Sequence, residues 1–187
     1  MTPRFTQAIA LAAKAHEGQN RKGTNIPYVS HPVAVAALVA RYGGDEDQQI
    51  AALLHDVLED AGPAWRPAID EFGQRVLAIV EACTDGTPDP DTGKKAPWKE
   101  RKEAYLAHLA ETPDDALLVS ACDKLHNAES ILLDLTETGP SVFDRFSASP
   151  EETVWYYREL SRIFTARKVA PAPALARTVA AIAEGMG

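Results

Sequence analysis

The sequence is poor in the features that mark several classes of protein. Among its 187 residues there are 2 cysteines, Cys83 and Cys122, and their separation is not typical of a metal site. We interpret both as small buried side chains in a reducing compartment. No apolar run approaches the roughly 20 residues of a membrane span, and the apolar stretch at 9–13 is interrupted too early for a signal peptide. We therefore expect a cytoplasmic protein with no membrane partner.

Basic residues are also in the minority. There are 19 Lys and Arg against 27 Asp and Glu, a formal net charge of −8. Nucleic-acid-binding proteins normally carry a basic face, so we expect no nucleic-acid partner, although a local basic pocket remains compatible with this charge. Apolar residues make up 45% of the chain and exclude a disordered composition. The length predicts a single domain, residues 1–187, with its own core.

Strand-like alternation is nearly absent, and apolar residues recur at helical spacing along the chain. This pattern predicts an all-α fold of about eight to ten helices. Proline near helix starts and glycine after helix ends set the boundaries, and the stretch 85–97, rich in Pro, Gly and Asp, predicts a mobile surface loop. The predicted helices cover about residues 5–18, 32–42, 45–62, 63–72, 74–84, 98–110, 113–135, 150–167 and 172–185.

Three polar residues follow apolar stretches where their burial is costly. They are His55, Asp56 and Asp123, and each carboxylate there needs an ion pair, a hydrogen-bond network or a metal. Each one alone is compatible with an ordinary buried ion pair. His31, at the start of its helix, is placed to point into a bundle as well. Together the four side chains offer two nitrogen and two oxygen ligands, which suits divalent Mn, Fe, Co or Zn better than Ca or Mg.

Helical spacing adds a second layer to this set. Residues four apart lie on one face of a helix, which places Glu59, Asp60 and Asn127 one turn beyond the candidate ligands. A bound cation makes water nucleophilic near neutral pH, and one carboxylate of the acidic pair could act as general base while the other orients the nucleophile or protonates the leaving group. The pattern predicts a hydrolytic site.

Basic residues gather in two places and indicate a phosphorylated substrate. Arg21 and Lys22 precede His31, and a second group consists of Lys94, Lys95, Lys99, Arg101 and Lys102. Such charges bind phosphate, and Arg also stacks on a base, but the lysines are equally compatible with a solvated face. The aromatic run 155–157 fits the core, although one member, such as Tyr156, could line a nucleotide pocket. His16 and His126 fit structural roles or hydrogen bonds to the ligands.

The ordered motifs resemble a known family. The set His31, His55-Asp56 and Asp123 resembles the signature of the HD phosphohydrolase superfamily. More narrowly, the sequence is similar to RelA/SpoT-type alarmone hydrolase domains, including small stand-alone and metazoan-type members. The likeness covers about residues 5–167 and is carried by the runs 15–22, 27–32, 55–60 and 123–127.

The resemblance implies a helical HD fold and a manganese-dependent enzyme that removes the 3′-pyrophosphate of guanosine tetra- and pentaphosphate. By this match His31, His55, Asp56 and Asp123 hold the metal, with Fe, Co or Zn as other candidates. Glu59 and Asp60 form the catalytic pair, and Asn127 contacts water or substrate. The substrate-binding residues would be Arg21, Lys22, Lys99, Arg101 and Tyr156.

Two other functions remain open from the sequence. Another HD phosphohydrolase, acting on a different phosphorylated nucleotide, would use the same metal chemistry. A non-catalytic alarmone sensor would bind the nucleotide without turnover. From the length of 187 residues we expect a stand-alone hydrolase without the synthetase and regulatory modules of the bifunctional members. The C-terminal helix at 172–185 could cap the core or mediate self-association.

Overall fold

The structure, a computed structural model, describes residues 2–84 and 96–186. Over these residues the chain forms nine α-helices and no strand, which confirms the predicted all-α fold. The helices are α1 (Pro3–Ala15), α2 (Ser30–Arg41), α3 (Glu46–Leu54), α4 (Arg66–Asp70), α5 (Gln74–Cys83), α6 (Trp98–Leu109), α7 (Asp114–Thr138), α8 (Pro150–Ala166) and α9 (Ala172–Gly185). The predicted loop at 85–97, including Lys94 and Lys95, lies outside the described residues except for its last two positions.

Local capping signals explain where several helices begin. The Asp45 side chain accepts a hydrogen bond from the Gln48 backbone while the Gln48 side chain accepts one from the Asp45 backbone, so a capping box starts α3. Ser149 and Glu152 form the same arrangement at α8, and Pro150 occupies the first turn. These boundaries agree with the sequence prediction because the donors and acceptors that make them are adjacent in the chain.

The predicted helix at 45–62 is wrong as a continuous element. Helix α3 ends at Leu54, His55 and Asp56 form a turn, and a π-helical segment follows at Val57–Ala61. The Asp60 N–H still donates to the Asp56 carbonyl at 2.9 Å, so the spacing of one turn between these two residues is retained. Helical distortions of this kind are frequent at functional sites. The two candidate ligands therefore lie at a break, which turns their side chains toward α7.

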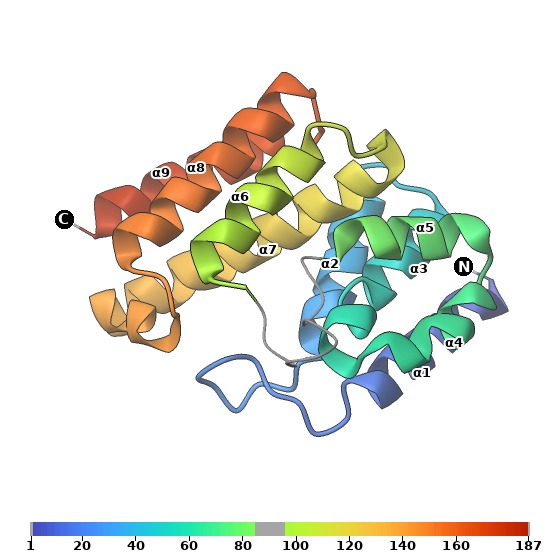
Figure 1. Ribbon diagram of the computed structural model, residues 1–187. Helices are drawn as coiled ribbons and strands as arrows, with labels where there is room; N and C mark the ends of the chain where they lie inside the picture. Colours follow the sequence, from blue (N-terminus) through green and yellow to red (C-terminus); the bar gives the residue numbers. More distant parts are fainter. Residues whose placement is uncertain (1, 85–95, 187) are drawn as a thin grey trace.

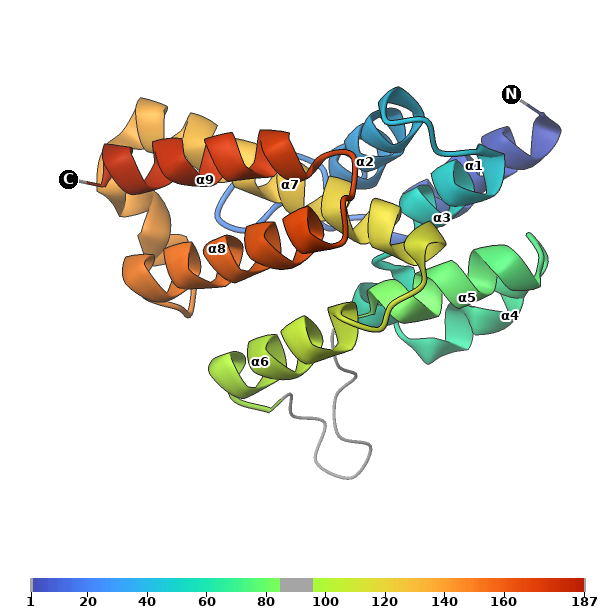
Figure 2. The same ribbon diagram turned by 90° about the horizontal axis from the view of Figure 1, so that it is seen from above.

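Helix α7 runs through the middle of the molecule and joins two sets of helices. Figures 1 and 2 show α1 to α5 around one half of α7, and α6, α8 and α9 around the other. One face of α7 contributes Val119 and Cys122 to the core of the first set, while Ala121 and Leu125 pack into the core of the second. Asp123 lies between these faces, at the junction of the two cores.

None of the described helices has the length and apolar character required to cross a membrane.

Candidate active site

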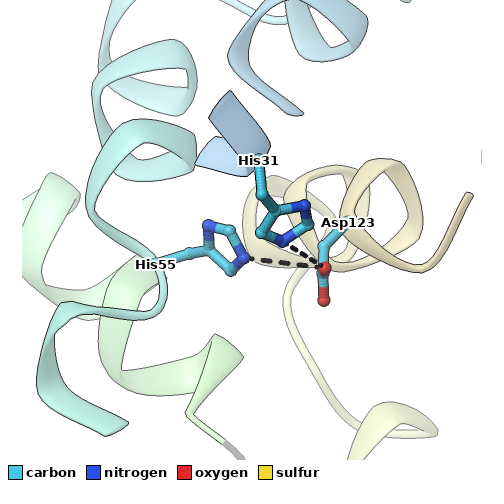
Figure 3. A group of neighbouring side chains, drawn as sticks. All are labelled: His31, His55 and Asp123. Carbon is cyan, nitrogen blue, oxygen red and sulfur yellow. Dashed lines mark ion pairs between the residues drawn. The ribbon is translucent and has the colours of Figure 1, made fainter. Parts of the chain in front are cut away.

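Four side chains from three separate segments meet at the junction beside α7. His31 comes from the first turn of α2, His55 and Asp56 from the turn after α3, and Asp123 from the middle of α7. Figure 3 shows both imidazole rings close to the carboxylate of Asp123. His31, His55 and Asp123 are 1%, 2% and 5% exposed, so water does not solvate their polar atoms. The structure thus brings together all four residues that the sequence predicts as metal ligands.

The polar atoms of these side chains form a small ring. The Nε2 atom of His31 lies 3.4 Å from Asp56 Oδ2 and 3.1 Å from Asp123 Oδ1. The Nε2 atom of His55 lies 3.0 Å and 3.6 Å from the same two oxygens. Ligands held about 2.0 to 2.2 Å from one cation are separated from their neighbours by about 3 to 3.5 Å. The spacing of the ring therefore fits a single divalent cation.

Hydrogen bonding fixes how His55 presents its ring. Its Nδ1–H donates to the carbonyl of Ala52 at 2.8 Å, so Nε2 carries a lone pair in the neutral ring. Among the described residues this buried Nε2 has no hydrogen-bond partner, although two carboxylate oxygens lie close by. A lone pair that faces carboxylates is repelled unless a proton or a cation lies between them. The arrangement fits a metal ligand oriented by a backbone carbonyl.

His31 is oriented by a second histidine. Its Nδ1 lies 2.8 Å from Nδ1 of His126, and one of the two nitrogens must donate. Burial, together with nearby His31 and Arg21, lowers the pKa of His126 to about 4, so His126 is neutral and can accept. With His126 as the acceptor, His31 would donate from Nδ1 and direct its Nε2 lone pair into the ring. The sequence suggested His126 only as a possible hydrogen-bond partner of the ligands.

The charges around the ring favour a cation. Burial opposes ionisation of Asp56 and Asp123, but His31 and His55 beside both of them, with Lys124 beside Asp123, hold the pKa values of both carboxyls well below the usual range. Lys124 Nζ lies 2.7 Å from Asp123 Oδ2, on the side away from the ring. In the cation-free protein the two carboxylates outweigh burial and raise the pKa of His55 well above its ordinary value. The two carboxylates therefore favour positive charge at the ring.

The loop between α1 and α2 adds hydrogen bonds to the site that the sequence did not predict. The Tyr28 hydroxyl donates to Asp56 Oδ2 at 2.5 Å, and burial and nearby carboxylates raise the pKa of Tyr28 so that it stays protonated. Asn127 donates to Asp123 Oδ1 at 2.5 Å and accepts from Arg21 at 2.7 Å. Neither Tyr28 nor Lys124 was a candidate from the sequence. Tyr28 and Asp56 lie on different segments, and the pairing of Lys124 with the adjacent Asp123 depends on side-chain placement.

The acidic pair lies on the π-helical segment. Glu59 is half-buried and Asp60 is exposed. Asp60 Oδ2 accepts a hydrogen bond of 2.8 Å from the side chain of Gln19. Both carboxylates therefore follow the candidate ligand turn directly, as the sequence spacing predicted, although the backbone between them is not regular α-helix.

A pocket of about 360 Å³ opens beside the ring, lined by Arg21, Lys22, Tyr28, Asn127 and Arg145 among others. The Arg21 guanidinium lies 5.6 Å from the centre of the Tyr28 ring, on the wall of this pocket. A second pocket of about 160 Å³ shares Asn127 and Tyr157 with the first. It is also lined by Lys102, Lys124 and Tyr156.

The predicted basic residues of α6 are only partly directed toward these pockets. Lys99 Nζ lies 5.6 Å from the ring centre of Trp155, and Arg101 lines a different pocket together with Tyr105 and His108. The neighbouring Lys102 lines the pocket near Asp123 instead. Arg145, on a short 3-10 helix at Gly139–Arg145, joins Lys22 in the larger pocket and had no signal in the sequence.

The fold and the site define a class of protein. The chain belongs to the HD-domain family, whose model matches residues 8–155. It is 36% identical over 128 residues to a Xenopus tropicalis protein named guanosine-3′,5′-bis(diphosphate) 3′-pyrophosphohydrolase MESH1, covering 67% of this chain and 68% of that protein. It is 34% identical over 134 residues to the Escherichia coli bifunctional (p)ppGpp synthase/hydrolase SpoT, covering 68% of this chain but 18% of SpoT.

A solved structure gives a further comparison. A metazoan ortholog of SpoT, described as hydrolysing ppGpp, superposes with a TM-score of 0.67 and 26% sequence identity. The match covers all of this chain and 93% of the other. The family implies a divalent metal, and the ring of His31, His55, Asp56 and Asp123 fits one.

Proposed function

We propose that this protein hydrolyses guanosine 3′,5′-bis(diphosphate) and its 5′-triphosphate analogue, releasing pyrophosphate from the 3′ position and leaving GDP or GTP. The observation that carries the proposal is the buried ring of two imidazole and two carboxylate acceptors next to a pocket with Arg21, Lys22 and Arg145. Similar proteins named for this reaction support the choice of substrate. Removing this 3′ group would lower the level of a stringent-response alarmone.

His31, His55, Asp56 and Asp123 would hold the metal, and we propose Mn²⁺ as the ion. The mixed nitrogen and oxygen set suits Mn²⁺, and it also accommodates Fe, Co or Zn. When bound, the cation would supply Lewis-acid chemistry that makes water nucleophilic near neutral pH and stabilises charge on a phosphoryl group. The Ala52 carbonyl, and His126 as an acceptor, would keep the two imidazoles in the tautomers that this role requires.

The pocket residues would bind the nucleotide. Arg21 is placed to stack on the guanine base, and Lys22 and Arg145 can neutralise phosphate at the rim of the larger pocket. Lys102 and Tyr156 line the adjoining pocket together with Lys124 and Asn127, which both contact Asp123. Arg101 lines a different pocket, and Lys99 lies against Trp155. We therefore assign phosphate binding on α6 to Lys102, with Lys99 and Arg101 at most on the path by which an anion approaches.

The acidic pair would handle the proton and the orientation of the nucleophile. Glu59 is half-buried directly after the ligand turn, where a carboxylate can accept a proton from the attacking water. Asp60, whose Oδ2 is held by Gln19, would orient that water or the leaving group. Asn127 links Asp123 to Arg21, so it would contact both the ligand sphere and the substrate.

The test is pyrophosphate release from guanosine tetraphosphate, measured with Mn²⁺, with chelator, and with a Glu59→Gln variant. We expect release that needs the cation, and a loss of at least about 100-fold in kcat for Glu59→Gln with Mn²⁺ binding retained. Glu137→Gln, on the exposed end of α7, is the matched control and should behave as wild type. Release of phosphate only from other nucleotides would indicate a different HD phosphohydrolase, and tight binding without turnover would indicate a sensor.

Three further features complete the proposal. We propose that residues 1–187 act as one domain, since α7 contributes to both cores and α9 packs on α7 and α8. Cys83 and Cys122 are buried free thiols, which fits a cytoplasmic enzyme. The partner would be a small guanosine polyphosphate.

A further inference from the structure

A short series of side chains leads from the end of α1 to the acidic pair. His16 caps α1 and is 3% exposed. Its Nδ1 lies 2.7 Å from Oε1 of Gln19, and Nε2 of Gln19 lies 2.8 Å from Oδ2 of Asp60. Asp60 is thus connected to a buried imidazole that neither the metal ring nor the nucleotide pocket uses.

The chemistry of the three groups fixes the direction of both hydrogen bonds. A carboxylate only accepts, so Gln19 must present its amide NH₂ to Asp60 and its carbonyl oxygen to His16. That oxygen also only accepts, so the proton of His16 must be on Nδ1. The reversed amide would place its carbonyl oxygen against the Asp60 carboxylate, two acceptors in contact. Among the described atoms, His16 Nε2 is buried with no hydrogen-bond partner, consistent with Nδ1 as the nitrogen that carries the proton and donates it to Gln19.

The backbone holds Gln19 in place independently of Asp60. Gly18 takes a left-handed conformation, φ +75°, that reverses the chain after α1. The Gln19 N–H then donates to the His16 carbonyl at 3.1 Å, and its carbonyl accepts from the Tyr28 N–H at 2.8 Å. The His16 ring also packs 4.8 Å, centre to centre, from the Tyr28 ring. Gln19 is therefore a fixed donor against which an exposed carboxylate can be oriented.

We infer that Gln19 and His16 are positioning residues for Asp60. This inference rests on the proposed function and deepens it, because it divides the roles within the acidic pair. Gln19 holds one oxygen of Asp60 and keeps the carboxylate plane constant, while His16 prevents the Gln19 amide from flipping. Asp60 is the orienting member, and proton transfer belongs to Glu59.

A double-mutant cycle tests whether Gln19 acts through Asp60. Gln19→Leu should lower kcat about tenfold, the loss of one hydrogen bond to a charged group, while KM and the Kd for Mn²⁺ stay within about twofold of wild type. Adding Gln19→Leu to Asp60→Asn should cause no further loss of kcat. Gln49→Leu removes a comparable side-chain hydrogen bond, to the Gly44 carbonyl, away from the site and should leave kcat unchanged. Multiplicative effects in the double variant would overturn the inference.

The second test concerns His16 and does not depend on activity. Nitrogen-15 NMR of the metal-free wild type should show His16 as the Nδ1–H tautomer, and Gln19→Leu should abolish that preference. His16→Asn, whose amide donor replaces Nδ1–H, should retain most of the kcat that His16→Gln loses. An Nε2–H tautomer of His16 in the wild type would overturn the inferred hydrogen bonds from His16 through Gln19 to Asp60. Absence of turnover in wild type would refute the proposed function, whereas full turnover in Gln19→Leu would refute the positioning role alone.

Discussion

Lys124→Met removes an ammonium group that is buried against a candidate metal ligand. Lys124 Nζ lies 2.7 Å from Asp123 Oδ2, and the two side chains are only 12% and 7% exposed. Burial disfavours the charged lysine, but Asp123 and nearby Tyr105 and Tyr156 raise its pKa well above the ordinary value. Lys124 is therefore charged in the folded protein, and its loss leaves Asp123 short of a partner.

The magnitude follows from the burial of the pair. Breaking a buried ion pair from one side costs about 3 to 5 kcal/mol. Asp123 keeps His31 and Asn127 as neighbours, so we expect the lower end, about 3 kcal/mol of the free energy of unfolding in the presence of chelator. For a chain of this size that corresponds to a fall in Tm of about 6 to 12 °C.

The cation should offset part of this loss. A divalent ion in the ring compensates the Asp123 charge, and removal of Lys124 also removes a positive charge that repels the ion. We expect the variant to bind Mn²⁺ about tenfold more tightly, or about 1.4 kcal/mol. By linkage, the loss of unfolding free energy at saturating Mn²⁺ should be smaller by the same amount.

The assay is thermal and urea unfolding with chelator or with Mn²⁺, together with a Mn²⁺ titration. Lys99→Met is the matched control, since Lys99 is exposed on α6 and should change Tm by no more than about 2 °C. Equal destabilisation of Lys124→Met with and without the ion, or weaker Mn²⁺ binding, would refute the electrostatic reasoning. A loss below about 1 kcal/mol would show that the pair is solvated.

Three other outcomes are expected. His55→Ala should weaken Mn²⁺ binding by more than about 100-fold in a titration, whereas His108→Ala, exposed on α6, should not change it. Arg21→Ala should raise KM about tenfold with kcat within about threefold, and Arg101→Ala, in a different pocket, should change KM little; equal effects would argue against a base-stacking Arg21. In chelator, the raised pKa of His55 means that its contribution to stability is complete below about pH 6.5 and is lost as pH rises through the folded pKa, so Tm should fall toward alkaline pH and Mn²⁺ should abolish that fall.

Much of the fold was predictable because its signals are local. The capping residues at Asp45 and Ser149, together with the apolar period, determine where helices begin and which faces are buried. The break after Leu54 was not predictable in this way. The run 45–62 has helical spacing throughout and contains no glycine or proline before Gly62, so no residue within it signals the distortion at Val57–Ala61.

The candidate ligands were predictable for a different reason. His55, Asp56 and Asp123 are expensive to bury, so their place after apolar stretches signals a compensating partner. The residues that surround them carry no such signal. Tyr28 and Lys124 are ordinary amphipathic side chains. The role of Tyr28 arises from a contact with Asp56 on another segment, and the pairing of Lys124 with the adjacent Asp123 depends on how both side chains are buried. The contact of the Lys99 side chain with Trp155 was equally unpredictable, because it depends on how α6 packs against α8.

One loop, between α1 and α2, donates hydrogen bonds toward three of the four carboxylates that the reaction would use. The bonds run from Tyr28 to Asp56, from Gln19 to Asp60, and from Arg21 through Asn127 to Asp123. The same loop lines the nucleotide pocket with Arg21 and Lys22. A base that stacks on Arg21 must share the guanidinium with Asn127, so nucleotide binding and the orientation of Asp123 are coupled. Because such coupling is reciprocal, the bound metal should change nucleotide affinity by the same factor by which the nucleotide changes metal affinity.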